Sequence, residues 1–180
     1  MAYRSYPLLV FGFHGCSRQV ASRVIAGEEE LNPSRNDYDW LGEGIYFWEN
    51  APERALQWAV DHYGASDAAV VGAVIQLSSC LNLMDKACNA ELRAAYDALR
   101  GRGVPLPKNK GGAHYLDKMI VQAAADFGKA IRGTDYDAVR GAFIEGEAIY
   151  PGASIMDDTH IQLCVRNPKS IIAYFHPRGI

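Results

Sequence analysis

Residues Leu8–Ser17 read LLVFGFHGCS, an apolar run that is followed at once by His14 and Gly15. The residues from Leu8 to Phe13 predict a short buried strand. Ser17 is one of the residue types that commonly cap helix N-termini. The helix after it would carry four apolar residues on one face, namely Val20, Ala21, Val24 and Ile25. The stretch therefore predicts a strand and a helix, with His14-Gly15 between them.

The rest of the chain also alternates between strand and helix patterns. Short apolar runs predict further strands at Ile45–Trp48, Val70–Leu77, Ala142–Ile144, His160–Val165 and Ile171–Phe175. Capping and periodicity signals predict further helices, one beginning at Asn50 and two spanning Ala87–Leu99 and Tyr115–Ile131. Strands near both ends with helices between them predict a mixed α+β fold.

The composition predicts one globular domain over residues 1–180. The chain is 49% hydrophobic and 22% charged, as is usual for a folded protein of this length. Its 18 basic and 21 acidic residues give a net charge of -3, which argues against nucleic-acid binding through bulk positive charge. The loop RGRGVPLPKNKGG, which begins at Arg100, nevertheless holds four basic residues and no acid. It is either a solvated connection or a contact for a phosphate-bearing partner.

Several protein classes are disfavoured by what the sequence lacks. The longest apolar run, around Ala68–Ile75, is far too short to span a membrane, and the first residues have no signal-peptide pattern. The four cysteines are scattered without a CxxC pair, so we expect reduced thiols and no metal site. The P-loop, Rossmann, zinc-peptidase and hydrolase motifs are absent. These features predict a soluble cytoplasmic protein without membrane contact.

Two motifs about thirty residues apart carry a family resemblance. His14-Gly15 follows the first strand, and Gly42–Phe47 reads GEGIYF. Together they resemble the catalytic domain of the diphtheria-toxin-like ADP-ribosyltransferases, the group that includes the poly(ADP-ribose) polymerases. Gly72–Leu77 is similar to that family's Gly-x-Val-x-Leu strand. The resemblance implies the ADP-ribosyltransferase fold, with a split antiparallel β core and flanking helices, and leaves residues 81–140 as a helical insertion.

The resemblance also implies roles in binding NAD. His14 matches the histidine that hydrogen-bonds an adenosine ribose hydroxyl. Gly15 matches the glycine whose backbone holds the nicotinamide carboxamide, and Tyr46 matches the tyrosine that lies against the nicotinamide ring. Gly44 and Phe47, in the same motif as Tyr46, are expected among the NAD-binding residues.

The chain departs from the family pattern at two positions. Arg54 stands where the family has a nicotinamide-binding serine; it either meets the NAD pyrophosphate or is a solvated helix residue. Gln162, on the strand His160–Val165, stands where the family has its catalytic glutamate. Strand alternation also puts His160 on the same face as Gln162, so either side chain could fill the third catalytic position. Because glutamine supplies no negative charge, chain elongation is disfavoured and transfer of a single ADP-ribose is expected.

The missing negative charge would then come from the loop before that strand. Its carboxylates are Glu145, Glu147, Asp157 and Asp158. The Glu145-Gly146-Glu147 group is the most site-like, because its glycine allows a tight turn that presents both side chains. We take Glu147 as the candidate catalytic base or electrostatic partner.

The sequence thus predicts an NAD-dependent mono-ADP-ribosyltransferase that releases nicotinamide and modifies a protein or nucleic-acid acceptor. NAD would be a substrate, and no metal is expected. Small free-standing enzymes of this kind resemble bacterial toxins or defence effectors that a partner protein of the antitoxin type neutralises. An NAD glycohydrolase and a catalytically inactive NAD-binding or interaction module remain the alternatives.

Overall fold

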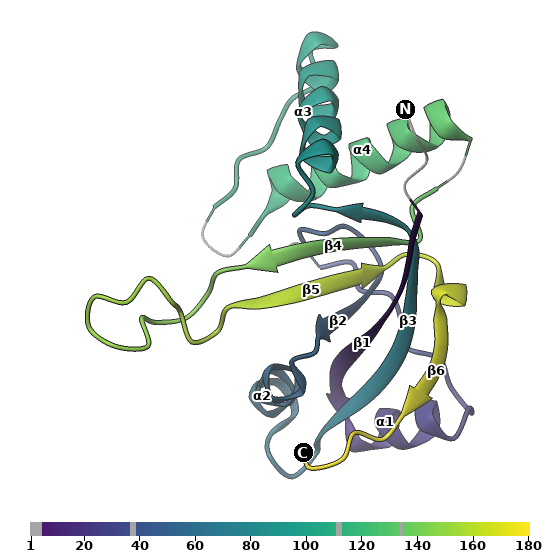
Figure 1. Ribbon diagram of the computed structural model, residues 1–180, viewed down its shortest axis with the longest axis vertical. Coiled ribbons are helices and arrows are strands. Elements are labelled where there is room, and N and C mark those ends of the chain that lie inside the picture. The colour runs from purple at the N-terminus through teal and green to yellow at the C-terminus, as the bar shows by residue number, and fades with distance from the viewer. Residues whose placement is uncertain (1–4, 37–38, 111–112, 134) are drawn as a thin grey trace.

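The computed structural model describes residues 5–36, 39–110, 113–133 and 135–180. These residues form a mixed α+β fold, which confirms the fold class expected from the sequence (Figure 1). The strands are β1 (Ser5–Ser17), β2 (Ile45–Glu49), β3 (Ala68–Asn82), β4 (Ala138–Phe143), β5 (His160–Val165) and β6 (Ile171–Phe175). The helices are α1 (Arg18–Ile25), α2 (Pro52–Tyr63), α3 (Lys86–Gly101) and α4 (Tyr115–Arg132), with a 3₁₀ turn at Pro168–Ser170.

The described strands form one sheet built from two antiparallel halves. One half contains β1, β3 and β6, and the other contains β2, β5 and β4. The halves meet where β1 pairs with β2, through Gly12 with Glu49 and Phe13 with Trp48, and where β3 pairs with β4. In Figure 1, β4 and β5 run in a different direction from β1 and β3. Because the β1–β2 pairing ends at Phe13, the next residue, His14, lies at the split between the halves.

The expectation of an antiparallel core is wrong at one seam. β3 and β4 are parallel there, with Cys80–Asn82 beside Ala138–Arg140. The chain travels from β3 to β4 through α3 and α4, and parallel neighbours require a long crossover of this kind. Within residues 81–140, where the resemblance implied a helical insertion, both ends belong to strands, and α3 and α4 lie between them. Of that segment, residues 111–112 and 134 lie outside the described residues.

β1 is longer than the apolar run predicted. Its pairing with β3 continues through His14 and Gly15 to Ser17, so these two residues lie within the strand and not after it. Ser17 then caps α1 as expected, since its Oγ accepts a hydrogen bond from the Val20 N–H at 3.4 Å.

The predicted helix start at Asn50 is wrong. α2 begins at Pro52, with Ala51 at the N-cap and no capping side chain. Asn50 instead has a φ of 51°, and its N–H donates to the Phe11 carbonyl oxygen at 3.0 Å. Asparagine tolerates this left-handed conformation better than most residues, so Asn50 turns the chain out of β2.

The buried side chains form clusters on the faces of the two half-sheets. One cluster packs α1 against β1 and β3, a second packs α3 and α4 against β4 and β5, and a small third packs α2 against β1, β2 and β3. Large buried members are Phe47 and Ile75 in the first, Val121 and Phe143 in the second, and Trp48 in the third. Among the described residues, no helix has the length and apolar character needed to cross a membrane.

Candidate functional site

One cavity brings together residues that are far apart in the sequence. Its volume is about 560 Å³, and β1, β2, β5, α2 and described residues between Leu31 and Trp40 contribute to its walls. It is lined by six of the residues that the sequence singled out, namely His14, Gly15, Tyr46, Phe47, Arg54 and Gln162. We call this space the His14 cavity.

His14 is held at the split between the half-sheets as a neutral ring. Its Nδ1 donates a hydrogen bond to the Tyr46 carbonyl oxygen at 2.8 Å, since a carbonyl can only accept. Burial lowers the pKa of His14 below its ordinary value, and the bond to Tyr46 opposes this only in part. A neutral ring with its proton on Nδ1 has an acceptor at Nε2. His14 can therefore accept a hydrogen bond from a hydroxyl group of a bound ligand.

Tyr46 supplies a fixed aromatic wall. Its hydroxyl donates to the Gly42 carbonyl oxygen at 2.8 Å, and the Cys164 thiol approaches the same oxygen at 3.6 Å. Burial raises the pKa of Tyr46 far above its ordinary value, so the phenol stays neutral. Because both ends of the side chain are held, the ring has a defined orientation in the cavity.

The backbone of Gly15 is placed to bind a ligand. The Phe11 carbonyl accepts a hydrogen bond from Asn50, so it points toward β2. Backbone groups alternate in direction along a strand, so the N–H and C=O of Gly15 point the same way as those of Phe11. The β1–β2 pairing has already ended at Phe13, and Gly15 lines the cavity. Its N–H and C=O can therefore reach a planar amide.

A second constraint at Gly15 is steric. A Cβ atom at this position would lie 2.4 Å from the Ala55 carbonyl oxygen and 3.2 Å from the Ala59 Cβ. Glycine therefore allows α2 to lie closely against β1, which sets the distance between the helix and the cavity floor.

Arg54 points into the cavity from α2 and is bound to the loop between β4 and β5. Its Nη2 lies 3.3 Å from Glu145 Oε2, and its Nε lies 3.6 Å from Asp158 Oδ1. The guanidinium carbon is 6.0 Å from the centre of the Trp48 ring. Arg54 is thus a partly buried cation at the cavity and not a solvated helix residue.

β5 places Gln162 and His160 in different surroundings. Gln162 lies in the middle of β5, is paired on both sides and lines the cavity. His160 is buried and stacks on Phe143 with ring centroids 5.5 Å apart. Its Nδ1 donates to the Asp158 carbonyl oxygen at 2.6 Å. Gln162 therefore shares the cavity with His14 and Tyr46, whereas His160 packs in the core.

The expectation that Glu147 faces the site is not met. Glu147 is exposed, and its N–H donates to Asp157 Oδ1 at 2.8 Å. Glu145 lines the cavity instead. Between them Gly146 has a φ of 85°, and its α-carbon packs closely against Asp157. The tight turn was expected to present both carboxylates, but it directs only one of them to the cavity.

Gly44 also lies outside the His14 cavity, and its role is packing. A Cβ atom there would lie 2.6 Å from both the Cys164 Sγ and the Val165 carbonyl oxygen. Glycine is therefore needed for the segment before β2 to pass closely against β5.

The cavity has aromatic walls that the sequence analysis missed. On α2, Trp58 and His62 follow Arg54 at four-residue intervals, and their rings stack with centroids 3.8 Å apart. Trp40 and His114 form a second stacked pair with centroids 4.3 Å apart. The four-residue spacing on α2 was a usable signal, since such residues share a helix face. No local pattern links Trp40 to His114.

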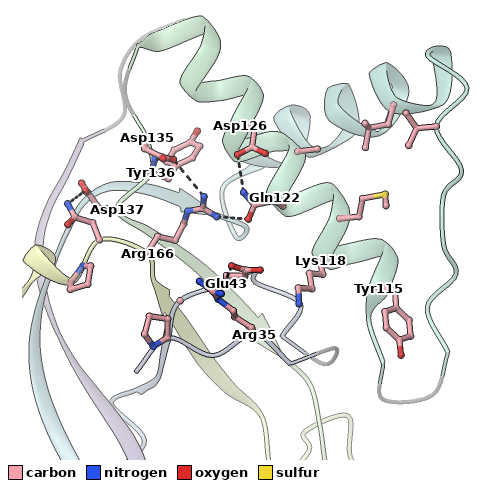
Figure 2. A pocket seen from close by; sticks show the side chains of 18 residues that line it. Arg35, Glu43, Tyr115, Lys118, Gln122, Asp126, Asp135, Tyr136, Asp137 and Arg166 are labelled. Carbon is pink, nitrogen blue, oxygen red and sulfur yellow. Dashed lines mark hydrogen bonds and ion pairs between the residues drawn. The ribbon is translucent and has the colours of Figure 1, made fainter. Parts of the chain in front are cut away.

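A second pocket, of about 990 Å³, lies against α4 (Figure 2). We call it the α4 pocket. Its side chains partner one another: Arg35 Nε lies 3.3 Å from Glu43 Oε2, and Arg166 Nη1 donates to Gln122 Oε1 at 3.0 Å. Apart from Gly44, none of the site residues expected from the sequence lines it.

Thiols and carboxylates do not assemble into a metal site within the described residues, where no group of three or more His, Cys, Asp or Glu could hold an ion. All four cysteines are buried. Burial raises the pKa of Cys16 to about 11 and those of Cys80 and Cys164 to about 12. These three groups are therefore protonated thiols at neutral pH.

Comparison with known proteins gives little further information. No family model and no solved structure matches the chain. A stretch of 37 residues is 46% identical to part of the "Uncharacterized protein MJ0359" of Methanocaldococcus jannaschii. The matched stretch makes up 21% of this chain and 17% of that protein. The chain therefore spans less than a fifth of the length of that relative, and the relative's name states no activity.

Proposed function

We propose that the protein is an NAD-dependent mono-ADP-ribosyltransferase with the ADP-ribosyltransferase fold. The observation that carries the proposal is the meeting of His14, Tyr46 and Gln162 in one cavity. These residues come from three strands that the chain separates by long intervals, and the resemblance to the transferase family singled out all three before their positions were known. The split between two antiparallel half-sheets, with His14 at its edge, also agrees with the proposal.

Each end of NAD has a chemically suitable partner in the His14 cavity. The Gly15 backbone groups suit the nicotinamide carboxamide, and the Tyr46 ring suits the flat face of the nicotinamide. His14 Nε2, as an acceptor, suits a ribose hydroxyl. Arg54 suits the pyrophosphate, because a guanidinium binds phosphate oxygens in a fixed geometry. The volume of about 560 Å³ lies within the usual range of small-molecule sites.

The reaction breaks the bond between the nicotinamide nitrogen and the ribose carbon. The bonding electron pair leaves with nicotinamide, and the ribose carbon becomes cationic until the acceptor attacks it and loses its proton. The protein contributes position and charge to this step. Gln162 can hold a ribose hydroxyl but carries no charge, so a carboxylate from elsewhere must stabilise the cation.

Glu145 is the carboxylate best suited to that role. Among the described residues two carboxylates line the cavity, and the other one, Asp39, accepts hydrogen bonds from Ser34 and from the Asn36 N–H. Glu145 is bound only through Arg54 among the described contacts. When a pyrophosphate takes Arg54, Glu145 is released toward the ribose. We therefore assign to Glu145 the part that the sequence analysis gave to Glu147.

The neutral Gln162 also favours two weaker alternatives. Water could replace the acceptor, which would make the protein an NAD glycohydrolase. A protein that binds NAD without cleaving it would also tolerate glutamine at this position. If the protein is a toxin or defence effector, we also propose that a partner protein of the antitoxin type neutralises it in its own cell.

Nicotinamide release by the purified protein separates these functions. A transferase releases nicotinamide only when cell lysate supplies acceptors, whereas a glycohydrolase releases it without lysate. Calorimetry with NAD should show binding by the wild-type protein and its loss in His14→Ala. If the wild-type protein does not bind NAD, the proposal is wrong.

A further inference from the structure

We propose, building on the transferase function, that the acceptor is a single-stranded nucleic acid held by the loop between α3 and α4. Charge is the first observation. Residues 81–140 contain ten Lys or Arg and seven Asp or Glu, whereas the rest of the chain contains eight and fourteen. The helical segment is thus net positive within a net negative protein. An asymmetry of this kind marks a surface for a polyanionic partner.

The excess cations are concentrated in the connection between the two helices. Arg100, Arg102, Lys108 and Lys110 are all exposed, and the sequence has no acid between Asp97 and Asp117. No ion pair is seen between these four cations and any described residue. Arg102 instead lies over the Phe127 ring, 5.3 Å from its centre. The charges are therefore available to phosphate groups.

The end of this loop is fixed in place beside the start of α4. Asn109 donates from Nδ2 to Asp117 Oδ2 at 2.8 Å, and its Oδ1 accepts from the Leu116 N–H at 3.0 Å. Lys110 and Ala113 exchange backbone hydrogen bonds at 2.9 and 3.1 Å. Lys108 and Lys110 consequently flank a residue, Asn109, that is bound to the start of α4.

The described residues that follow this loop reach the His14 cavity. His114, which precedes α4, lines the cavity and stacks on Trp40 with an interplanar angle of 12°. Trp40 is supported by the Phe143 ring, whose centroid lies 3.9 Å away. Exposed cations a few residues from stacked aromatic rings combine the two features with which proteins bind single strands: phosphates follow the charges and bases stack on the rings.

The chemistry of transfer to such an acceptor is balanced. A base nitrogen or a hydroxyl oxygen of the strand forms a bond to the ribose carbon of NAD, while nicotinamide leaves with the electron pair of the broken bond. The proton of the attacking group passes to a carboxylate of the site, for which Glu145 is placed. No oxidant or metal is consumed.

Fluorescence anisotropy with labelled 12-residue single-stranded RNA and DNA tests the binding surface. The variant Lys108→Gln/Lys110→Gln should bind roughly tenfold more weakly at low salt. The slope of log affinity against log salt should become shallower by about 0.7 for each phosphate that the variant no longer binds. The matched control Lys169→Gln/Arg178→Gln removes the same charge near β6 and should bind as the wild type does. NAD binding measured by calorimetry should be unchanged in both variants.

Incubation with labelled NAD then identifies the acceptor. Label should enter the single-stranded oligonucleotide with the wild-type protein and much less with the loop variant. The inference is overturned if no oligonucleotide binds, if both double variants weaken binding equally, or if label enters only protein in a nuclease-treated lysate. Each of these results leaves NAD binding by the wild-type protein intact, and only its absence would contradict the transferase function itself.

Discussion

The His14 cavity and the α4 pocket share one wall but differ in what their walls can do. Alternate residues of the same segment face the two spaces, with Ser34 and Asn36 toward the His14 cavity and Pro33 and Arg35 toward the α4 pocket. The α4 pocket is the larger of the two, at about 990 Å³ against about 560 Å³. Size alone would select it as the functional site.

Chemistry favours the smaller space. In the α4 pocket several charged side chains contact one another or neighbouring polar groups: Figure 2 shows Arg166 between Asp135 and Gln122. The Lys118 amine also donates to the Asn36 carbonyl oxygen at 2.9 Å. The His14 cavity combines aromatic walls, a neutral histidine with an acceptor nitrogen, and backbone groups at the end of a ladder. The comparison teaches that a site is identified by the groups that its walls leave available for a ligand.

His14→Ala against Arg35→Ala is the strongest test of that contrast. Loss of His14 should lower the rate of nicotinamide release by about a thousandfold, because it removes a preorganised partner of the ribose. Arg35, on the wall of the α4 pocket, is 76% exposed, and its loss should leave the rate unchanged. Thermal melting of both variants checks that they remain folded. Equal effects of the two substitutions would contradict the assignment.

Two glutamines sharpen the comparison further. Gln162→Ala should reduce nicotinamide release about a hundredfold, as for the loss of one preorganised hydrogen-bond partner. Gln122→Ala removes the same side chain from the α4 pocket and should not affect the rate. His160→Ala should lower the melting temperature more than Gln162→Ala, since His160 is buried in the core. A normal rate in Gln162→Ala would show that this residue does not act in the reaction.

Glu145 and Glu147 allow the same comparison within one turn, between a carboxylate that lines the His14 cavity and one that lies outside it. Glu145→Gln should slow nicotinamide release roughly tenfold, since it removes a charge-assisted interaction. Glu147→Gln makes the same chemical change two residues away, on a side chain outside the cavity, and should have little effect. Steady-state kinetics on both variants measure the difference. The reverse order of effects would restore the role that the sequence gave to Glu147.

Gly15→Ala tests the packing between β1 and α2. A Cβ atom at 2.4 Å from the Ala55 carbonyl oxygen forces the helix to move, which should cost about 1–3 kcal/mol of stability. Gly101→Ala is the control, because a Cβ atom there meets nothing within 4 Å. Denaturant unfolding of both variants gives the two free energies. A stable Gly15→Ala protein would show that α2 adapts easily.

The pH dependence of stability should show the smallest effect. Burial lowers the pKa of His14 in the folded state, so in acid the unfolded state binds more protons. Stability should therefore fall as the pH drops below the ordinary histidine pKa of about 6.5 toward the folded value. His14→Gln should lack this part of the decline when urea unfolding is compared at pH 7 and pH 5. An equal decline in both proteins would assign the effect to other groups.

The sequence by itself determined most elements and predicted several residues that line the His14 cavity. β5 and β6 have the predicted bounds, and α3 and α4 agree within two residues at each end, because periodicity and capping are local properties. His14, Gly15 and Tyr46 were chosen from two local motifs, and the structure places all three in one cavity.

The remaining features depended on contacts between distant segments. β1 continues through His14 because β3 pairs with it there, although the local sequence suggested that the strand had ended. The parallel seam between β3 and β4 depends on how α3 and α4 return the chain. Trp40 meets His114 only because α4 packs beside the segment before β2.

Tertiary contacts also separated candidate residues that are neighbours in the sequence. Gln162 and His160 share a strand face, and Glu145 and Glu147 share a turn, so local pattern alone could not separate the members of either pair, and the sequence prediction selected Gln162 and Glu147. The stacking of His160 on Phe143 and the pairing of Glu145 with Arg54 separated them. Side-chain type and spacing are written in the sequence, but which side chain faces a cavity is decided by the residues that pack against it.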